Sequence, residues 1–201
     1  MTPAIEVVDL HKRYADGEVT AVAGVSFTVE RGQIFGYLGR NGSGKTTTVR
    51  MLTTLSRPTS GSATVVGLDV VERAAEVRRR IGVTMQDAAL DPQMSAREHV
   101  RFVAGALGHR RGAARRRADE VLEIFGLIEP ADRRIATFSG GMARRLDIAT
   151  ALLGEPEVLF LDEPTTGLDP QSRRSLWSEI RRLRDAGTAV FLTTQYLEEA
   201  D

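Results

Sequence analysis

The chain has 201 residues, and its 27 Lys and Arg residues are balanced by 27 Asp and Glu residues, so the formal net charge is zero. This length predicts one domain and leaves little room for two. A hydrophobic fraction of 42% and a charged fraction of 27% are close to those of average soluble globular proteins. Zero net charge disfavours binding of nucleic acid by bulk electrostatic attraction. Because the chain has no cysteine, disulfides, thiolate nucleophiles and zinc sites with sulfur ligands are excluded.

Membrane and secretion signals are missing from the sequence. No run of about 18 apolar residues could cross a bilayer. The N-terminal residues lack the long apolar stretch of a signal peptide. We therefore expect a cytoplasmic chain that reaches a membrane only through a partner.

Short β-branched runs alternate with helical patterns, which predicts an α/β fold with a mostly parallel core sheet. The expected strands are, in chain order, Ile5–Asp9, Val25–Val29, Ile34–Leu38, Ala63–Val66, Ile81–Met85, Val158–Asp162 and Ala189–Thr193. The expected helices are Lys45–Leu55, Ala74–Arg80, Ala96–Leu107, Ala114–Phe125, Met142–Leu153, Gln171–Asp185 and a last one that starts near Tyr196.

Two regions differ from this alternation. In the first 30 residues, two strands flank Asp16-Gly17, which predicts an N-terminal antiparallel β-layer. From about Ser95 to Thr137 no convincing strand occurs, and Ser95 with Glu98 forms a capping box at the start of a helix. We expect a helical subdomain over about residues 88–155 within a single domain.

A phosphate-binding pattern, G-x-x-x-x-G-K-[ST], lies between an apolar strand and a helical run. It consists of Gly39, Arg40, Asn41, Gly42, Ser43, Gly44, Lys45 and Thr46, and Thr47 follows. The glycines let backbone N–H groups point at phosphate oxygens, and the helix adds the positive end of its dipole. Lys45 would contact the β- and γ-phosphates, and the Thr46 hydroxyl would ligate Mg²⁺. Since Lys45 is one of only two lysines, a chance match would be rare.

Two carboxylates end the apolar strand Val158–Asp162. Ligands of open α/β sheets bind at the carboxyl ends of the strands, where Asp162 could hold Mg²⁺ through water. Glu163 could polarise an attacking water as general base. The alternative, a strand that ends in a solvated acidic turn, is disfavoured by the neighbouring phosphate loop.

A second anion site is predicted about 95 residues after the first. Ser139 is a favourable N-cap, and Gly140 and Gly141 expose backbone N–H groups at the start of a helix. Such a site could close over the γ-phosphate of a nucleotide held by another subunit. The alternative is a flexible turn before a helix.

The segment Phe138–Met142 (FSGGM) resembles the signature motif of the ATP-binding cassette (ABC) ATPases. Other motifs of that family occur in the same order. Tyr14 matches the aromatic residue that stacks on adenine, and Gln86 matches the Q-loop glutamine that contacts the metal. Pro164–Asp169 (PTTGLD) matches the segment through the D-loop, so Asp169 is expected near nucleotide. The resemblance extends over residues 14–195.

This resemblance implies a P-loop ABC cassette that binds and hydrolyses Mg·ATP. Two cassettes would pair head-to-tail, as a homodimer or with a related cassette, and each signature would cover the ATP of the other. The cassette would drive an integral-membrane permease made by a separate chain, and would lie on the inner face of the cell membrane. The implied process is export, with a drug or antibiotic as the first expected cargo and a lipid, polysaccharide precursor or natural product as the second.

Two positions depart from the usual pattern of the family. Met142 stands where Gln is usual, and Gln195 stands where the switch region usually carries His. Gln can donate its amide N–H to a γ-phosphate but cannot take up a proton. Both departures resemble the branch of daunorubicin/doxorubicin-resistance ATP-binding proteins. We therefore expect Gln195 to be functional and ATPase activity to survive.

The sequence disfavours two alternatives to an exporter. A soluble ABC ATPase that acts on ribosomes or nucleic acid usually carries two cassettes, a long coiled coil or zinc modules. The 53 residues that separate Gln86 from Ser139 have no room for a coiled coil. A non-hydrolysing regulatory cassette would be expected to lack Lys45 or Glu163, and both are present.

The resemblance also implies strands and helices beyond the switch region. The sequence ends at Asp201, six residues after Gln195. We therefore expect residues 1–201 to be one C-terminally truncated cassette domain.

Overall fold

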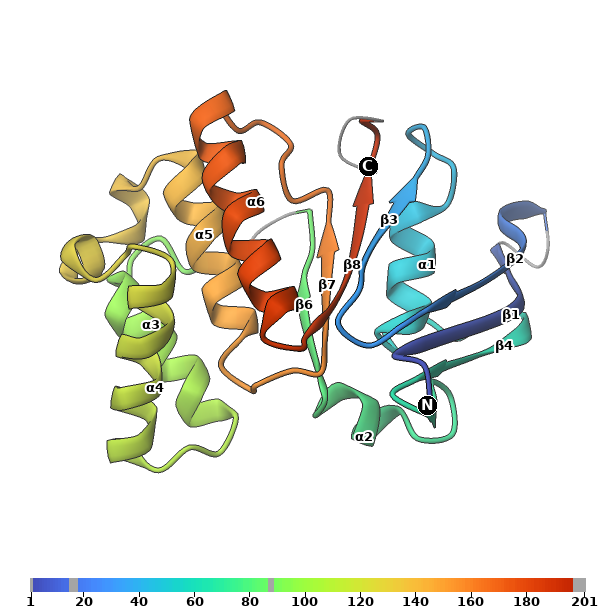
Figure 1. Ribbon diagram of the computed structural model, residues 1–201, viewed down its shortest axis with the longest axis horizontal. Coiled ribbons are helices and arrows are strands. Elements are labelled where there is room, and N and C mark those ends of the chain that lie inside the picture. The colour runs from blue at the N-terminus through green and yellow to red at the C-terminus, as the bar shows by residue number, and fades with distance from the viewer. Residues whose placement is uncertain (1, 15–17, 87–88, 197–201) are drawn as a thin grey trace.

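The computed structural model describes residues 2–14, 18–86 and 89–196, which form two sheets with helices between and beside them (Figure 1). The core sheet is parallel, with the strand order β3-β8-β7-β6. Its strands are β3 (Ile34–Leu38), β8 (Ala189–Thr194), β7 (Val158–Asp162) and β6 (Ile81–Thr84). The second sheet has the order β2-β1-β4-β5 and is antiparallel. The predicted α/β class, with a parallel core and an N-terminal antiparallel layer, is confirmed.

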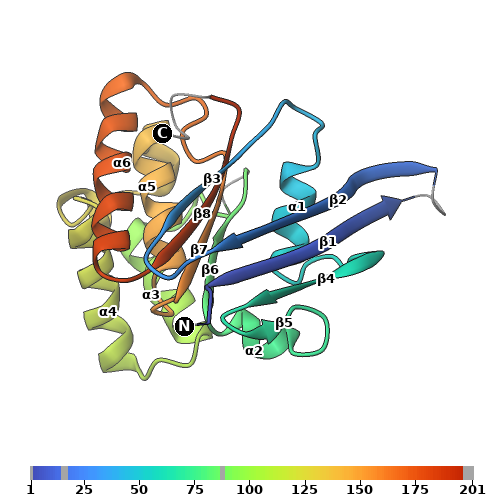
Figure 2. The same cartoon turned by 45° about the vertical axis from the view of Figure 1, so that its right-hand side comes forward.

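The antiparallel sheet is larger than expected (Figure 2). It contains β1 (Ile5–Tyr14), β2 (Val19–Val29), β4 (Ser60–Val65) and β5 (Leu68–Asp69). Strands β1 and β2 exceed their predicted lengths because their pairing continues through several register shifts, up to Tyr14 opposite Val19. The short strand β5 was not predicted, since two residues carry no periodicity. The predicted Asp16-Gly17 turn lies outside the described residues.

The strands β7 and β8 are buried on both faces, as their apolar sequences predict. Alternate side chains point to opposite sides. On one side Phe160 and Phe191 join the core that α1 (Lys45–Leu52) shares with the antiparallel sheet. On the other side Leu161 and Leu192 pack with the helices α5 (Gly140–Ala151) and α6 (Pro170–Asp185). Figure 1 shows α1 and the antiparallel sheet on one side of the core sheet and α5 and α6 on the other, so the core sheet lies between two apolar clusters.

The helical region has the expected content. It holds α3 (Ala96–Ala106), α4 (Arg111–Ile124), the short 3₁₀ helices η2 (Glu129–Asp132) and η3 (Ile135–Thr137), and then α5. The predicted capping box is confirmed, because Ser95 N–H donates to Glu98 Oε2 at 2.9 Å and Ser95 Oγ accepts from Glu98 N–H at 3.2 Å. Outside this region, the described residues also form α1, α6 and the short helix α2 (Ala74–Arg78).

Several predicted helix boundaries were wrong. The helix α5 begins at Gly140 rather than Met142, because Ser139 caps it. The helix α1 ends at Leu52 rather than Leu55, since Thr54 adopts a positive φ of 66°. The helix expected near Tyr196 lies mostly outside the described residues.

Phe191 on β8 is the central ring of an aromatic cluster on the side of the core sheet that faces α1 and the antiparallel sheet. It is fully buried, and its centroid lies 5.6–5.8 Å from four other rings, those of Phe27, Phe35, Tyr37 and Phe160. Phe191→Ala should lower the free energy of unfolding by about 3–5 kcal/mol, because it removes this packing and leaves a cavity. Urea denaturation measures the loss.

Phe102→Ala is the matched control. Phe102 is 64% exposed on α3, so its truncation should change stability by less than about 0.5 kcal/mol. Equal losses for the two variants would contradict the central place of Phe191 in the core.

Candidate nucleotide site

The phosphate loop connects β3 to α1 and depends on Gly44. This residue is the N-cap of α1, with φ 91°. A Cβ at position 44 would lie 2.2 Å from the carbonyl oxygen of Ala21 on β2, so only glycine fits there. No side chain caps the helix, and its first N–H groups are left for an anion. No sequence motif indicates that Ala21 would form part of this site.

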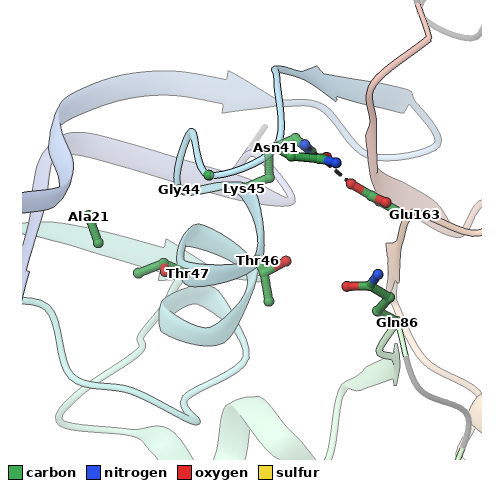
Figure 3. Close-up of a pocket in the computed structure, with 9 residues that line it drawn as sticks. Ala21, Asn41, Gly44, Lys45, Thr46, Thr47, Gln86 and Glu163 are labelled. Atoms are coloured by element: carbon green, nitrogen blue, oxygen red, sulfur yellow. Dashed lines mark ion pairs between the residues drawn. The ribbon is translucent and has the colours of Figure 1, made fainter.

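Lys45 is only 5% exposed and makes three polar contacts at the loop. Its Nζ donates to the carbonyl oxygens of Gly39 at 2.8 Å and Arg40 at 3.2 Å. It also lies 3.2 Å from Glu163 Oε1, as the dashed line in Figure 3 marks. The two residues predicted as phosphate contact and general base are therefore in direct contact in this structure.

The carboxylates at the end of β7 are held by a residue that sequence analysis missed. The hydroxyl of Thr193 donates to Asp162 Oδ1 at 2.5 Å and accepts the backbone N–H of Glu163 at 2.9 Å. Glu163 has φ 48°, in the left-handed region that is strained for a residue with a side chain. Thr193 lies opposite Asp162 in the parallel pairing of β7 and β8, a register that only the fold supplies.

A cavity of about 390 Å³ brings together several of the predicted nucleotide-binding residues. Thr46 and Gln86 stand on facing walls of it (Figure 3). The complete lining is Ala21, Asn41, Gly42, Gly44, Lys45, Thr46, Thr47, Gln86 and Glu163. A second hollow of about 330 Å³ shares two of these residues, and its lining is Gln86, Gly140, Ala143, Arg144, Glu163, Thr166, Gly167 and Leu168. Gln86 and Glu163 thus face both the phosphate loop and the start of α5.

The signature residues begin α5 as predicted. Ser139 Oγ accepts the N–H of Met142 at 3.2 Å, which confirms Ser139 as the N-cap. A Cβ at Gly141 would lie 2.7 Å from Ser172 Oγ on α6, so this glycine allows the first turns of the two helices to pack closely. Ser139 and Gly140 are exposed at this helix start.

The predicted Mg²⁺ residues fit a metal that is completed by phosphate oxygens. Thr46 and Gln86 line the cavity, and the buried Oδ2 of Asp162 has no hydrogen-bond partner among the described residues. Nowhere in the described part of the chain do three His, Cys, Asp or Glu side chains gather to hold a metal by themselves. A divalent ion there would therefore need ligands from the nucleotide.

The comparisons with known proteins agree with this geometry. A protein-family model described as ABC transporter matches residues 22–166. The chain belongs to the ABC transporter family. The doxorubicin resistance ATP-binding protein DrrA of Mycobacterium tuberculosis is 49% identical over 198 residues. That match covers 98% of this chain and 60% of the relative, so the chain spans about 60% of its length. The resemblance to the daunorubicin/doxorubicin-resistance branch is confirmed.

Solved structures confirm the cassette fold. The structure of cbiO1 from Clostridium perfringens, part of the ABC transporter complex cbiONQ, has a TM-score of 0.88 at 28% identity and covers 98% of this chain and 80% of that chain. An ATP-binding cassette solved as a dimer in a post-hydrolysis state with ADP and Pi has a TM-score of 0.87 at 25% identity. It covers 98% of this chain and 90% of that chain. Within the described residues of this cassette, no helix is both long and apolar enough to cross a membrane.

Tyr14 and Gln195 are among the predicted nucleotide-site residues that lie outside the cavity lining. Tyr14, at the end of β1, is 39% exposed, and Lys12 Nζ lies 4.9 Å from the centre of its ring. Gln195 is exposed just after β8. The preceding carbonyl, that of Thr194, accepts the N–H of Gly39 at 3.2 Å. Gln195 is therefore adjacent to the phosphate loop of the cassette, and its contact with a γ-phosphate stays a prediction.

Asp169 caps α6 within its own chain. Its Oδ1 accepts the N–H groups of Gln171 and Ser172, each at 2.9 Å, and its Oδ2 accepts the Ser172 hydroxyl at 2.6 Å. These hydrogen bonds, led by that of the Ser172 hydroxyl, lower the pKa of Asp169. A nucleotide contact from Asp169 would have to come from the face that this cap leaves open, so it stays a prediction.

A buried ion pair on α5 was not anticipated. Arg144 Nη1 lies 3.2 Å from Asp147 Oδ2, and both side chains are only 10% exposed. Burial raises the pKa of Asp147 to about 6, although Arg144 and the backbone N–H of Ala89 favour its charged form. Burial also lowers the pKa of Arg144. The sequence indicates only two polar residues three positions apart on a helix.

This pair makes stability depend on pH in a defined direction. The pKa of Asp147 is higher in the folded chain than its ordinary value of 3.8, so this group favours folding at low pH and loses that contribution as pH rises to about 6. Asp147→Asn should therefore gain stability relative to the parent by up to roughly 3 kcal/mol between about pH 4 and pH 7. Urea unfolding of both proteins across this range measures the difference. A difference that stays constant with pH would contradict the raised pKa.

Proposed function

We propose that the chain is the ATP-binding and ATP-hydrolysing part of an ABC exporter. In this proposal it binds Mg·ATP, pairs head-to-tail with a second cassette and drives a separate membrane permease from the inner face of the membrane. The observation that carries the proposal is the cavity in which Lys45 and Thr46 on one wall face Glu163 and Gln86 on the other. Phosphate-binding groups and a carboxylate base are thereby gathered in one polar cavity.

Binding of the triphosphate would use the loop before α1. The free N–H groups at the start of α1 and the Lys45 ammonium would bind phosphate oxygens. Thr46 and Gln86, with Asp162 behind them, would hold Mg²⁺. The ion would neutralise the charge that develops on the β- and γ-phosphates. The environment of Asp162, with one oxygen fixed by Thr193 and the other unpartnered, suits a carboxylate that holds a metal through water.

Hydrolysis would use Glu163 as the general base. In the structure Lys45 pairs with this carboxylate, so phosphate oxygens that take over Lys45 would release Glu163 to accept a proton from water. Thr193 holds the backbone of Glu163 in place during this exchange. Glu163 would therefore become free to accept a proton from water only when the phosphates are bound.

Pairing of two cassettes would complete the site. Ser139 and Gly140 are exposed at the start of α5, where backbone N–H groups could bind the γ-phosphate held by the partner cassette. ADP lacks that phosphate, so the bound nucleotide would no longer favour the closed dimer after hydrolysis. A structurally similar cassette, 25% identical, was solved as a dimer with ADP and Pi. Opening and closing of the dimer would then drive the permease.

The cargo is proposed to be a drug, an antibiotic or another natural product. This rests on the 49% identity to a protein whose name states doxorubicin resistance, and on the shared cassette fold. The cavity that contains Lys45 and Glu163 is proposed to hold phosphate and gives no information on the cargo. The permease would therefore recognise the cargo.

Glu163→Gln tests the proposed base. The substitution keeps the shape of the side chain but removes its proton affinity, so kcat should fall about 10²–10⁴-fold while ATP still binds. A dimer trapped in the ATP-bound state should appear by gel filtration with Mg·ATP. Glu157→Gln is the matched control, since Glu157 only pairs with Arg31 and Arg80 at the surface.

The outcomes separate the parts of this proposal. The control should keep parental activity, and Lys45→Ala should abolish both ATP binding and the dimer. Unchanged turnover in Glu163→Gln would exclude Glu163 as the base.

Gln195 is proposed to sense the γ-phosphate through its amide N–H. Gln195→Ala should lower kcat about tenfold, the value of one hydrogen bond to a charged group. Gln195→His should keep turnover within about threefold, because imidazole also presents an N–H donor. Steady-state phosphate release measures both. If neither variant changes kcat, Gln195 has no sensor role.

A further inference from the structure

We propose that Arg144 is a positioning residue for ATP hydrolysis, whose guanidinium holds the ends of β6 and β7 against the signature helix α5. This inference rests on the proposed ATPase function. Arg144 donates to three backbone carbonyl oxygens, those of Met85 at 2.8 Å, Asp162 at 2.8 Å and Pro164 at 3.2 Å. These carbonyls come from two separate segments, and α5 supplies the donor.

Each of these carbonyls adjoins a residue of the site. Met85 precedes Gln86, and Glu163 lies between Asp162 and Pro164. Gln86 and Glu163 are the two residues that line both hollows of the site. Arg144 therefore acts on their backbone and controls where their side chains point.

The chemistry of arginine suits this arrangement. The guanidinium is a planar fork with five N–H donors, so one side chain can bridge several acceptors whose relative positions it then fixes. Hydrogen bonds from a charged donor are stronger than neutral ones, and those of Arg144 are largely shielded from water. Lysine has a single nitrogen and could not reach the same acceptors in the same geometry.

Asp147 fixes Arg144 from the same helix. Its Oδ2 lies 3.2 Å from Arg144 Nη1, one turn further along α5. The backbone N–H of Ala89, on the other side of Gln86, favours the charged form of this carboxylate. Arg144 and Asp147 thus both act next to Gln86 from one helix. No other charged side chain of the described chain shares a hydrogen bond with this pair.

The phosphate-binding residues do not depend on Arg144. Lys45 Nζ is held by the carbonyl oxygens of Gly39 and Arg40, and Arg144 contacts neither of these residues. Loss of Arg144 should therefore leave ATP binding in place and impair turnover. A general loss of folded structure would change both.

The test compares two arginines that each donate to backbone carbonyls, Arg144 beside the site and Arg117 away from it. Arg144→Gln and Arg144→Lys should each lower kcat by about tenfold or more, with KM for ATP within about threefold of the parent. Arg117→Gln is the matched control. Arg117 Nη2 donates to the carbonyl of Leu152 at 2.7 Å, at the far end of α5. This variant should keep the parental kcat.

Asp147 offers a rescue pair that leaves Arg144 in place. Asp147→Asn keeps an oxygen for the guanidinium and should retain kcat within about threefold. Asp147→Leu has similar volume without an acceptor, and its kcat should fall toward that of Arg144→Gln. The two Asp147 variants test the positioning role of Arg144 even if the Arg144 variants do not fold.

A second readout does not need hydrolysis. Amide hydrogen exchange over residues 81–86 and 162–166 should be faster in Arg144→Gln and Asp147→Leu than in the parent, and unchanged in Arg117→Gln. Equal kcat and equal exchange in the Arg144 and Arg117 variants, or equal kcat for Asp147→Asn and Asp147→Leu, would overturn the proposal. If the parent binds ATP but does not hydrolyse it, the proposed function fails. The exchange result then decides separately whether Arg144 holds these segments.

Discussion

The parallel register of four strands is the constraint on which the rest of the site depends. It places Leu38 opposite Thr194 and Asp162 opposite Thr193. The phosphate loop, the two carboxylates and Gln195 therefore all follow the carboxyl ends of their strands at the same edge of the sheet. A shift of one residue in β8 would turn the Thr193 side chain to the other face and remove the hydroxyl that holds Asp162 and Glu163. The two apolar clusters fix this register, because each fills one face of β7 and β8.

Two ion pairs lie close to the reacting groups, and their surroundings give them different roles. Lys45 and Glu163 meet on the wall of an open polar cavity, where an incoming phosphate can replace the carboxylate. Arg144 and Asp147 meet where the guanidinium already binds three carbonyls. Burial of charge is costly unless the remaining donors and acceptors are satisfied, and here the backbone satisfies them. The first pair can therefore exchange partners, whereas the second has reason to persist.

The sequence predicted what local patterns determine. Periodicity located most strands and helices, and the glycines around Lys45 predicted a loop that the positive φ of Gly44 confirms. Contacts across the sheet could not be predicted in this way. Thr193 reaches a carboxylate 31 positions earlier, and Arg144 reaches a carbonyl 59 positions earlier. Such contacts depend on strand register and helix placement, so Thr193 and Arg144 looked like ordinary residues of a strand and a helix.

The placement of α5 connects the pairing surface to the site. Gly141 in its first turn packs against Ser172 of α6, so the starts of these helices are held together at the signature. One turn further along α5, Arg144 binds the backbone on both sides of Glu163. A force on the exposed start of α5 would therefore be transmitted through a rigid helix to the residues around the base. Because the core is close-packed, such a force would shift α5 and the ends of β6 and β7 together. The helix α5, which would contact the nucleotide of a partner cassette, therefore also holds the backbone on both sides of the proposed base Glu163 in its own cassette.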